Sequence, residues 1–392
     1  MGVFLRRSRK FIILLLVFTG LYHPVLLRAE YLQFGPDIFI NMPASWYVEE
    51  VGENKFSAAN RAGEAFLLVK YTSGDEFDKV SEMYSHYSSG LQAEIISRSA
   101  FLFSGNSAET GIIRFPYNGI SHTGYLLCVE THRVHVVVLG FCPEESFQDY
   151  QDMLLSAIDS LALGESGLMA PGPISQYISP YPEADRRMYS LRYKDADLPV
   201  SLSSGALEAS QELIEREARV LVVYAGTPYA EEAWQRYYRI IYRDLYRRSR
   251  PIYSALRNYL SPEKMTEREI TENLLQWVQG FTYKRLDSVS DCLTPIRGAV
   301  ENTGDCDSRG LLLTIMLHYY GIDAILMVSG MYGHSMVGVD IPGNGARFAH
   351  NGKSYLLAET TDQVSLGMID MNMANPAGWL GIDFLNTRIQ TE

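Results

Sequence analysis

The sequence has few cysteines and lacks the common motifs for nucleotide and zinc binding. Four cysteines occur in 392 residues, at positions 128, 142, 292 and 306. None of them forms a CxxC pair, the usual spacing of a structural zinc site. No GxxxxGK or GxGxxG run is present, so nothing indicates a phosphate-binding loop. The chain also shows no internal repeat and no low-complexity tract.

Positive charge is scarce in this chain. Lys and Arg number 34 against 46 Asp and Glu, which gives a formal net charge of -12. Residues 1–29 carry five positive charges and no negative one, so without them the net charge is -12 - 5 = -17. Nonspecific nucleic-acid binding needs a basic surface that displaces counterions from phosphates. We therefore expect no nucleic-acid partner.

The one long hydrophobic run is too short and too interrupted for a membrane span. A basic start, MGVFLRRSRK, is followed by FIILLLVFTGLY and by LLRA before Glu30. His23 and Pro24 end the apolar run short of the roughly 20 residues that a spanning helix needs. This order is typical of a secretory signal peptide. We expect residues 1–29 to be removed, membrane contact only before cleavage, and a periplasmic or secreted protein, with an uncleaved anchor as the alternative.

The length and the 47% hydrophobic content are sufficient for two domains. Residues 30–162 alternate short strand patterns with helical patterns near 76–90 and at 144–161, and the apolar face of the second helix is expected to lie on a sheet. Residues 163–187 hold four prolines and three glycines, which predicts a linker. Residues 188–392 form the second domain, with a helical lead-in at 204–281 and a core at 282–365.

Neither cysteine pair is expected to form a disulfide. If residues around Cys128 and Cys142 form a hairpin, Cys128 lies opposite a residue near 136. Cys142 is then about six positions, or roughly 20 Å, away along the ladder. Cys292 and Cys306 would pair only if the loop between them folded back, and nothing in the sequence requires that.

The helical pattern at 230–249 carries five arginines within thirteen positions, 236 to 248. One interpretation is a patch for an anionic ligand or a membrane surface. The interpretation that we favour is a bundle helix. In it, Trp234, Tyr238, Ile241 and Leu245 pack inward, while the arginines extend toward the surface and pair with acids.

Cys306 stands at the predicted start of a helix. The run GDCDSRGLLLTIMLHYYGI favours a helix over 306–320, with Thr303 or Asp305 as its cap and Gly321 as its stop. Free backbone N–H groups in a first helical turn favour a thiolate. The flanking residues Asp305 and Asp307 oppose it, so a nearby base would decide in favour of the thiolate.

A histidine and an acid follow on two predicted strands. His334 begins GHSMVGV and Glu359 ends SYLLAE. An antiparallel register that pairs His334 with Glu359, and therefore Gly338 with Tyr355, places both side chains on one face. A carboxylate beside a histidine fixes its tautomer and supports its charged form. Alternatively, NGK at 351–353 closes a tight hairpin between ARFAH and SYLL.

The ordered set of motifs resembles the transglutaminase-like superfamily over about residues 270–365. The carrying segments are TPIRGAVENTGDCDSRGLLLTIMLHYYGIDAILMVSG, GHSMVGV and YLLAETT. The resemblance implies a papain-like core in which Cys306 is the nucleophile and His334 the general base. Glu359 stands where the family usually has aspartate, and Tyr283 is the candidate for oxyanion support. GDCD lacks the aromatic residue that often follows the cysteine in protein-crosslinking members.

The first domain resembles the PsbP-like fold over residues 33–162, through FINMPASWYVEE and the order of its elements. Together the two resemblances imply an α+β protein: an N-terminal α/β/α sandwich with an antiparallel sheet, then a helix-rich transglutaminase-like domain. The first domain would serve as a partner-binding or scaffolding module.

We expect an exported thiol enzyme, a cysteine peptidase or amidase that acts through an acyl-enzyme on a peptide or protein substrate, without cofactor or metal. A catalytically inactive binding or scaffold protein of the cell envelope is the alternative. Zinc bound by Cys306, His334 and nearby acids is a third hypothesis, which the long spacings disfavour.

Overall fold

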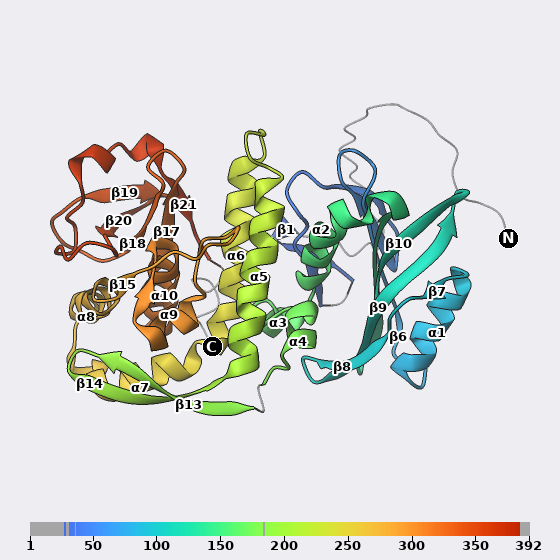
Figure 1. Ribbon diagram of the computed structural model, residues 1–392, viewed down its shortest axis with the longest axis horizontal. Helices are drawn as coiled ribbons and strands as arrows, with labels where there is room; N and C mark the ends of the chain where they lie inside the picture. Colours follow the sequence, from blue (N-terminus) through green and yellow to red (C-terminus); the bar gives the residue numbers. More distant parts are fainter. Residues whose placement is uncertain (1–26, 29–30, 36, 183–184, 385–392) are drawn as a thin grey trace, which may run out of the picture.

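The computed structural model describes residues 27–28, 31–35, 37–182 and 185–384. The predicted signal peptide therefore lies outside the described residues, apart from the short strand β1 (Leu27–Arg28). Two lobes of mixed helix and sheet lie side by side, with the long helices α5 (Ser204–Val222) and α6 (Ala230–Arg248) between them (Figure 1). The predicted α+β class is confirmed.

The N-terminal lobe is built on an antiparallel sheet in the order β4-β5-β6-β11-β10-β9-β7, with β8 paired to β9. Its strands are β4 (Tyr47–Val51), β5 (Lys55–Ala59), β6 (Phe66–Ser73), β7 (Glu94–Ile95), β8 (Ser99–Phe103), β9 (Asn106–Tyr117), β10 (Ile120–Glu130) and β11 (Val134–Pro143). A smaller sheet joins β1, β2 (Tyr31–Phe34), β3 (Ile38–Ile40) and β12 (Ala162–Leu163).

Helices cover both faces of the large sheet, because its central strands are apolar on both sides. In β10, Leu127 and Val129 pack with α2 (Phe147–Asp159), while Leu126 and Cys128 pack with α1 (Val80–Gly90). Alternation with a period of two is what a strand dictates. The result is the expected sandwich, and α2 lies on the sheet as predicted.

The cysteines are not paired with one another. Cys128 lies opposite Val137, one position from the predicted partner, and Cys142 lies opposite Thr123 at the far end of the same hairpin. All four cysteines are free and buried. This agrees with the ladder argument for Cys128 and Cys142.

The segment predicted as a linker is instead packed between the lobes. It contains α3 (Gly164–Gly167) and α4 (Pro173–Ile178), and residues 167–176 are all buried. Pro173 occupies the first turn of α4, where its missing N–H does no harm. The Asp159 carboxylate, at the end of α2, accepts hydrogen bonds from the N–H groups of Ile174 (2.8 Å) and Ser175 (3.0 Å). Gly172 and Pro173 therefore mark the capped start of a short helix rather than an extended linker.

Three of the five arginines of α6, Arg236, Arg243 and Arg248, are buried, which corrects the expectation that they extend toward the surface; Arg239 and Arg247 are partly exposed. Arg236 bonds Glu217 of α5 (3.0 Å) and the Asn41 carbonyl oxygen of the N-terminal lobe (3.0 Å). Arg243 donates to carbonyl oxygens of residues 159–161 at the end of α2. Arg216 of α5 bonds Asp159 at 2.7 Å. Buried charges need such partners, and these tie both lobes into one body. The predicted inward packing of Tyr238, Ile241 and Leu245 is confirmed, and Trp234 packs against the same core while only partly buried.

The C-terminal lobe places helix α10 in the middle of its core. α10 (Cys306–Tyr319) packs against α8 (Glu267–Gln279), α9 (Pro295–Glu301) and the antiparallel sheet β19-β20-β18-β17-β21. The strands of that sheet are β17 (Ala324–Ser329), β18 (His334–Val339), β19 (Arg347–His350), β20 (Lys353–Ala358) and β21 (Leu380–Ile382). The other elements are the hairpin β13 (Arg186–Tyr193) and β14 (Ala196–Ser203), helix α7 (Arg250–Leu260), and the short parallel pair β15 (Thr282–Tyr283) and β16 (Thr303–Gly304).

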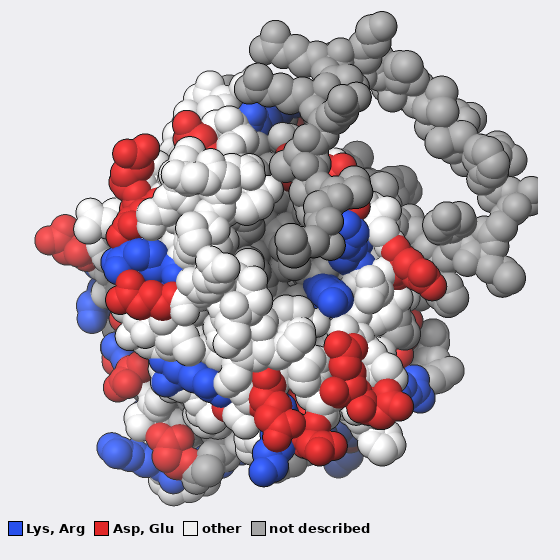
Figure 2. Space-filling view, turned by 90° about the vertical axis from the view of Figure 1, so that its right-hand side faces the viewer, with Lys and Arg blue, Asp and Glu red and all other residues white. Residues whose placement is uncertain are grey.

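In the part of the chain that the structure describes, every helix is too short or too polar to cross a bilayer. The face that the N-terminal lobe presents in Figure 2 shows acidic and basic side chains interspersed around an uncharged centre.

Candidate active site

Asp305 caps the helix that carries the candidate nucleophile. Its Oδ1 accepts hydrogen bonds from the N–H (2.9 Å) and the hydroxyl (2.6 Å) of Ser308. Asp305 is therefore the N-cap of α10, whereas Thr303, the other predicted cap, lies in β16. Cys306 is the first residue of α10 and is 2% exposed. Its own N–H has no carbonyl one turn earlier to bond, as in every first helical turn.

His334 and Glu359 meet as predicted, although the strand register differs. His334 opens β18 and Glu359 follows β20, and His334 Nε2 lies 2.8 Å from Glu359 Oε2. Gly338 pairs with Leu357 rather than with Tyr355, a shift of two residues from the prediction. A shift of two keeps each side chain on its face of the sheet. The long side chain of Glu359 covers the remaining distance.

The hairpin that we weighed as an alternative is also present. β19 and β20 pair directly across the turn at Asn351 and Gly352, where both residues have positive φ. β20 bonds β19 on one side and β18 on the other. The two interpretations of NGK were therefore compatible, because a central strand has two edges.

Hydrogen bonds hold the histidine in its charged form. Burial opposes the charge, but hydrogen bonds to Cys306 and Glu359 outweigh it and raise the pKa of His334 to about 10. Burial likewise opposes the charge of Glu359, yet His334 and Thr361 keep the pKa of that carboxyl below its usual value. Because Nε2 is taken by Glu359, Nδ1 is the nitrogen that remains for the thiol. Glu359 Oε1 is fixed by the N–H (2.7 Å) and the hydroxyl (2.6 Å) of Thr361.

Tyr283 lies at the mouth of the site. Its backbone pairs with Gly304, two residues before Cys306. The ring is about half exposed, and the phenol oxygen accepts a hydrogen bond from Arg285 Nε at 3.0 Å. Burial and the nearby Cys306 raise the pKa of Tyr283 against the effect of Arg285. The structure thus brings Tyr283 to the neighbourhood of Cys306, and its role in oxyanion support stays a prediction.

Three further residues, which the sequence analysis did not identify, hold the side chains or backbone around Cys306, His334 and Glu359. Trp379 meets the His334 ring edge to face, with ring centroids 6.2 Å apart. Gln279 of α8 donates to the Glu359 carbonyl oxygen at 2.8 Å and so fixes the backbone that carries the acid. Arg309, 1% exposed, donates to the carbonyl oxygens of residues 281, 304 and 360. One helical turn after Cys306, it joins the loops that carry Tyr283 and Glu359.

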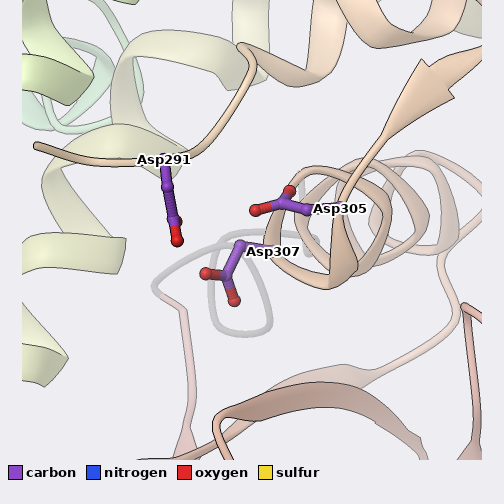
Figure 3. A group of neighbouring side chains, drawn as sticks. All are labelled: Asp291, Asp305 and Asp307. Carbon is purple, nitrogen blue, oxygen red and sulfur yellow. The ribbon is translucent and has the colours of Figure 1, made fainter. Parts of the chain in front are cut away.

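An acidic cluster adjoins the cysteine. Asp291, Asp305 and Asp307 each direct a carboxylate oxygen to one region, with these atoms within 4.8 Å of one another (Figure 3). Burial and the neighbouring Asp307 raise the pKa of Asp305 to about 7, and burial raises the pKa of Asp307. The zinc hypothesis combined Cys306 and His334 with such acids. Among the described residues, the group with the spacing of a metal site contains neither of those two side chains.

The comparisons with known proteins concern protein families, curated proteins and solved structures. No protein family and no curated protein matches it. Among solved structures, it is similar to the PsbP protein CyanoP of Synechocystis sp. PCC 6803, with 10% identity over 32% of this chain and 86% of that one and a TM-score of 0.28. LpqN, involved in cell envelope biogenesis of Mycobacterium tuberculosis, has 13% identity over 32% of this chain and 80% of its own, with a TM-score of 0.22.

A protein of Bacteroides thetaiotaomicron VPI-5482 covers more of the chain, 82% of this one and 87% of its own, at 11% identity and a TM-score of 0.27. Likenesses of this size establish neither a shared fold nor a shared function.

Proposed function

We propose that this protein is a thiol hydrolase that cleaves peptide or carboxamide bonds through an acyl-enzyme on Cys306. The observation that carries the proposal is the His334–Glu359 pair, 2.8 Å apart, with His334 also hydrogen bonded to a cysteine in the first turn of a helix. A nucleophile, a base and an orienting acid in this order form the general arrangement of a catalytic triad.

The chemistry follows from the roles of the three side chains. The Cys306 thiolate attacks the carbonyl carbon, and N–H groups at the start of α10 stabilise the oxyanion. The protonated His334 then transfers its proton to the leaving amine as the C–N bond breaks. Water, deprotonated by His334, attacks the thioester and releases the acid, which restores the thiol. Glu359 keeps the imidazole oriented throughout.

The expected signal peptide favours action outside the cytoplasm, in the periplasm or beyond the cell. The substrate is then a peptide or protein of that compartment. The N-terminal lobe, with no chemical motif of its own, would serve to recruit a protein partner.

The competing function is an inactive binding protein that retains the shape of such an enzyme. Two observations favour it. Cys306 is only 2% exposed, and it is flanked by two acids, of which Asp305 is buried and Asp307 partly buried. In that case the thiol would react no faster than an ordinary buried one.

The pH dependence of thiol alkylation separates the two functions. Wild type and His334→Ala are treated with iodoacetamide between pH 5 and 9, and each cysteine is followed by peptide mass mapping. Cys292, 1% exposed and also in the C-terminal lobe, serves as the internal control. We expect Cys306 alone to react rapidly below pH 7, and to lose that reactivity in His334→Ala. Equal rates for Cys306 and Cys292 in wild type would reject the enzyme.

A further inference from the structure

A cavity of about 270 Å³ is lined by the residue that follows the candidate nucleophile. It lies between α5, α6 and the loop before α9, and we call it the α5/α6 cavity. Three aromatic residues of α6 form one wall: Trp234, Tyr237 and Tyr238. Trp234 stacks on Tyr238 with ring centroids 5.7 Å apart. Asp307, the residue after Cys306 in the first turn of α10, also lines the cavity.

Two acidic residues contribute to the lining of the cavity. Asp291 and Asp307 both line it, and the carboxylate of Asp305 is directed toward them (Figure 3). Asp305 is 0% exposed, and its Oδ2 has no hydrogen-bond partner among the described residues. A buried carboxylate oxygen without a partner is costly. This oxygen therefore lacks a donor that a bound molecule would supply.

We propose that the α5/α6 cavity binds a substrate side chain that ends in a primary ammonium group, with its alkyl part on the aromatic wall and its charge among the three aspartates. This inference rests on the proposed function, since it assigns the cavity to the substrate of Cys306. It narrows that substrate to a peptide or amide that carries a lysine-like group.

The shape and chemistry of the cavity favour an ammonium over other cations. An ammonium group has three donors, and three carboxylates each offer one oxygen to the same region. Trp and Tyr faces attract cations and also cover an alkyl chain. A calcium ion takes six to eight oxygen ligands, which a largely aromatic wall does not provide. Arg285 forms an exposed ion pair with Asp291 at 3.2 Å. A bound ammonium group would therefore share the Asp291 carboxylate with Arg285.

The test uses pentylammonium chloride and its neutral counterpart 1-pentanol as probes. Isothermal titration of the chain from residue 30 measures both affinities at low ionic strength, in wild type, Asp291→Asn and Asp307→Asn. Asp287→Asn is the matched control, because Asp287 is an exposed acid of the same loop outside the cavity. Calcium and magnesium chloride are titrated in parallel, and thermal unfolding verifies that each variant is folded.

We expect pentylammonium to bind on the order of tenfold or more tightly than 1-pentanol, a difference of about 1.4 kcal/mol per factor of ten. Asp291→Asn should remove most of that difference, and Asp287→Asn should leave it intact. Asp291 lies in a partly exposed loop, so this variant remains informative if Asp307→Asn does not fold.

Three results would overturn the inference: equal affinity for the two probes, an equal loss in Asp287→Asn, or stoichiometric binding of calcium or magnesium without binding of pentylammonium. Repeating the titration in Cys306→Ala separates this inference from the proposed function. Binding in that variant supports the cavity whatever the thiol does, whereas the alkylation experiment tests the thiol whatever the cavity binds.

Discussion

Replacing Glu359 with glutamine tests the electrostatics of the candidate site directly. The amide keeps the size of the side chain and still accepts the hydrogen bonds of Thr361, but it loses the charge that faces His334 Nε2 at 2.8 Å. An opposite charge at this distance shifts a pKa by about 1–3 units. The pKa of His334, about 10 in the wild type, should therefore fall by that amount in Glu359→Gln.

The same change should lower the stability of the fold at neutral pH. His334 has a folded pKa of about 10 against an ordinary value of 6.5. A raised pKa stabilises the fold fully below the unfolded value, and the contribution is lost as the pH rises through the folded value. Glu359→Gln should therefore lower the free energy of unfolding by about 1.4–4 kcal/mol near pH 7, at 1.36 kcal/mol per pKa unit. The gap should close above pH 10, where His334 is neutral in both proteins.

NMR titration of the His334 Cε1–H signal measures the pKa, and urea unfolding at pH 7 and pH 10 measures the stability. The alkylation rate of Cys306 at pH 9 should fall in parallel, because a His334 pKa lowered from about 10 leaves less imidazolium at that pH to support the thiolate. A wild-type His334 that titrates near 6.5, or an unchanged titration in Glu359→Gln, would refute the reasoning.

Two further substitutions test the surroundings of the site. Asp305→Asn keeps the helix cap and removes a carboxyl whose pKa is raised from 3.8 to about 7. Because its charged form is disfavoured in the fold, the variant should match wild type at pH 4 and gain roughly 2–4 kcal/mol above pH 7; no gain in urea unfolding at pH 8 would contradict this. Glu217→Gln removes the negative charge that pairs with buried Arg216 and Arg236, so it should lower the free energy of unfolding by about 3–5 kcal/mol. Glu208→Gln, an exposed acid on the same helix, should cost almost nothing in the same assay.

Local patterns predicted the parts of this fold that local forces decide. The helix at Cys306 follows from an apolar run between an aspartate cap and Gly321, and it begins at the expected residue. The meeting of His334 with Glu359 needed only the face of each strand, which a period of two preserves. The register itself was two residues off, because β20 must also satisfy its hairpin with β19.

Long-range contacts explain the features that the sequence did not reveal. Trp379, the residue before β21, reaches His334, and no local signal marks the place of this fifth strand beside β17. Arg236 is charged, and its burial depends on Glu217 and Asn41, 19 and 195 positions away. The helix α4 depends on a cap from Asp159, in a different element. An apolar stretch such as GWLGI at 378–382 was the only available hint of the extra strand.

The buried ion pairs and hydrogen bonds between the two lobes determine the smallest part of this protein that can fold by itself. Val220 of α5, Ala233 of α6 and Tyr224 in the turn between these helices complete the apolar core of the N-terminal lobe. A fragment that began at residue 188 would expose these side chains and leave Arg243 without the carbonyl oxygens it bonds. Neither half is therefore a module that can be exchanged between proteins. Expression of the C-terminal lobe alone should therefore yield an aggregating chain.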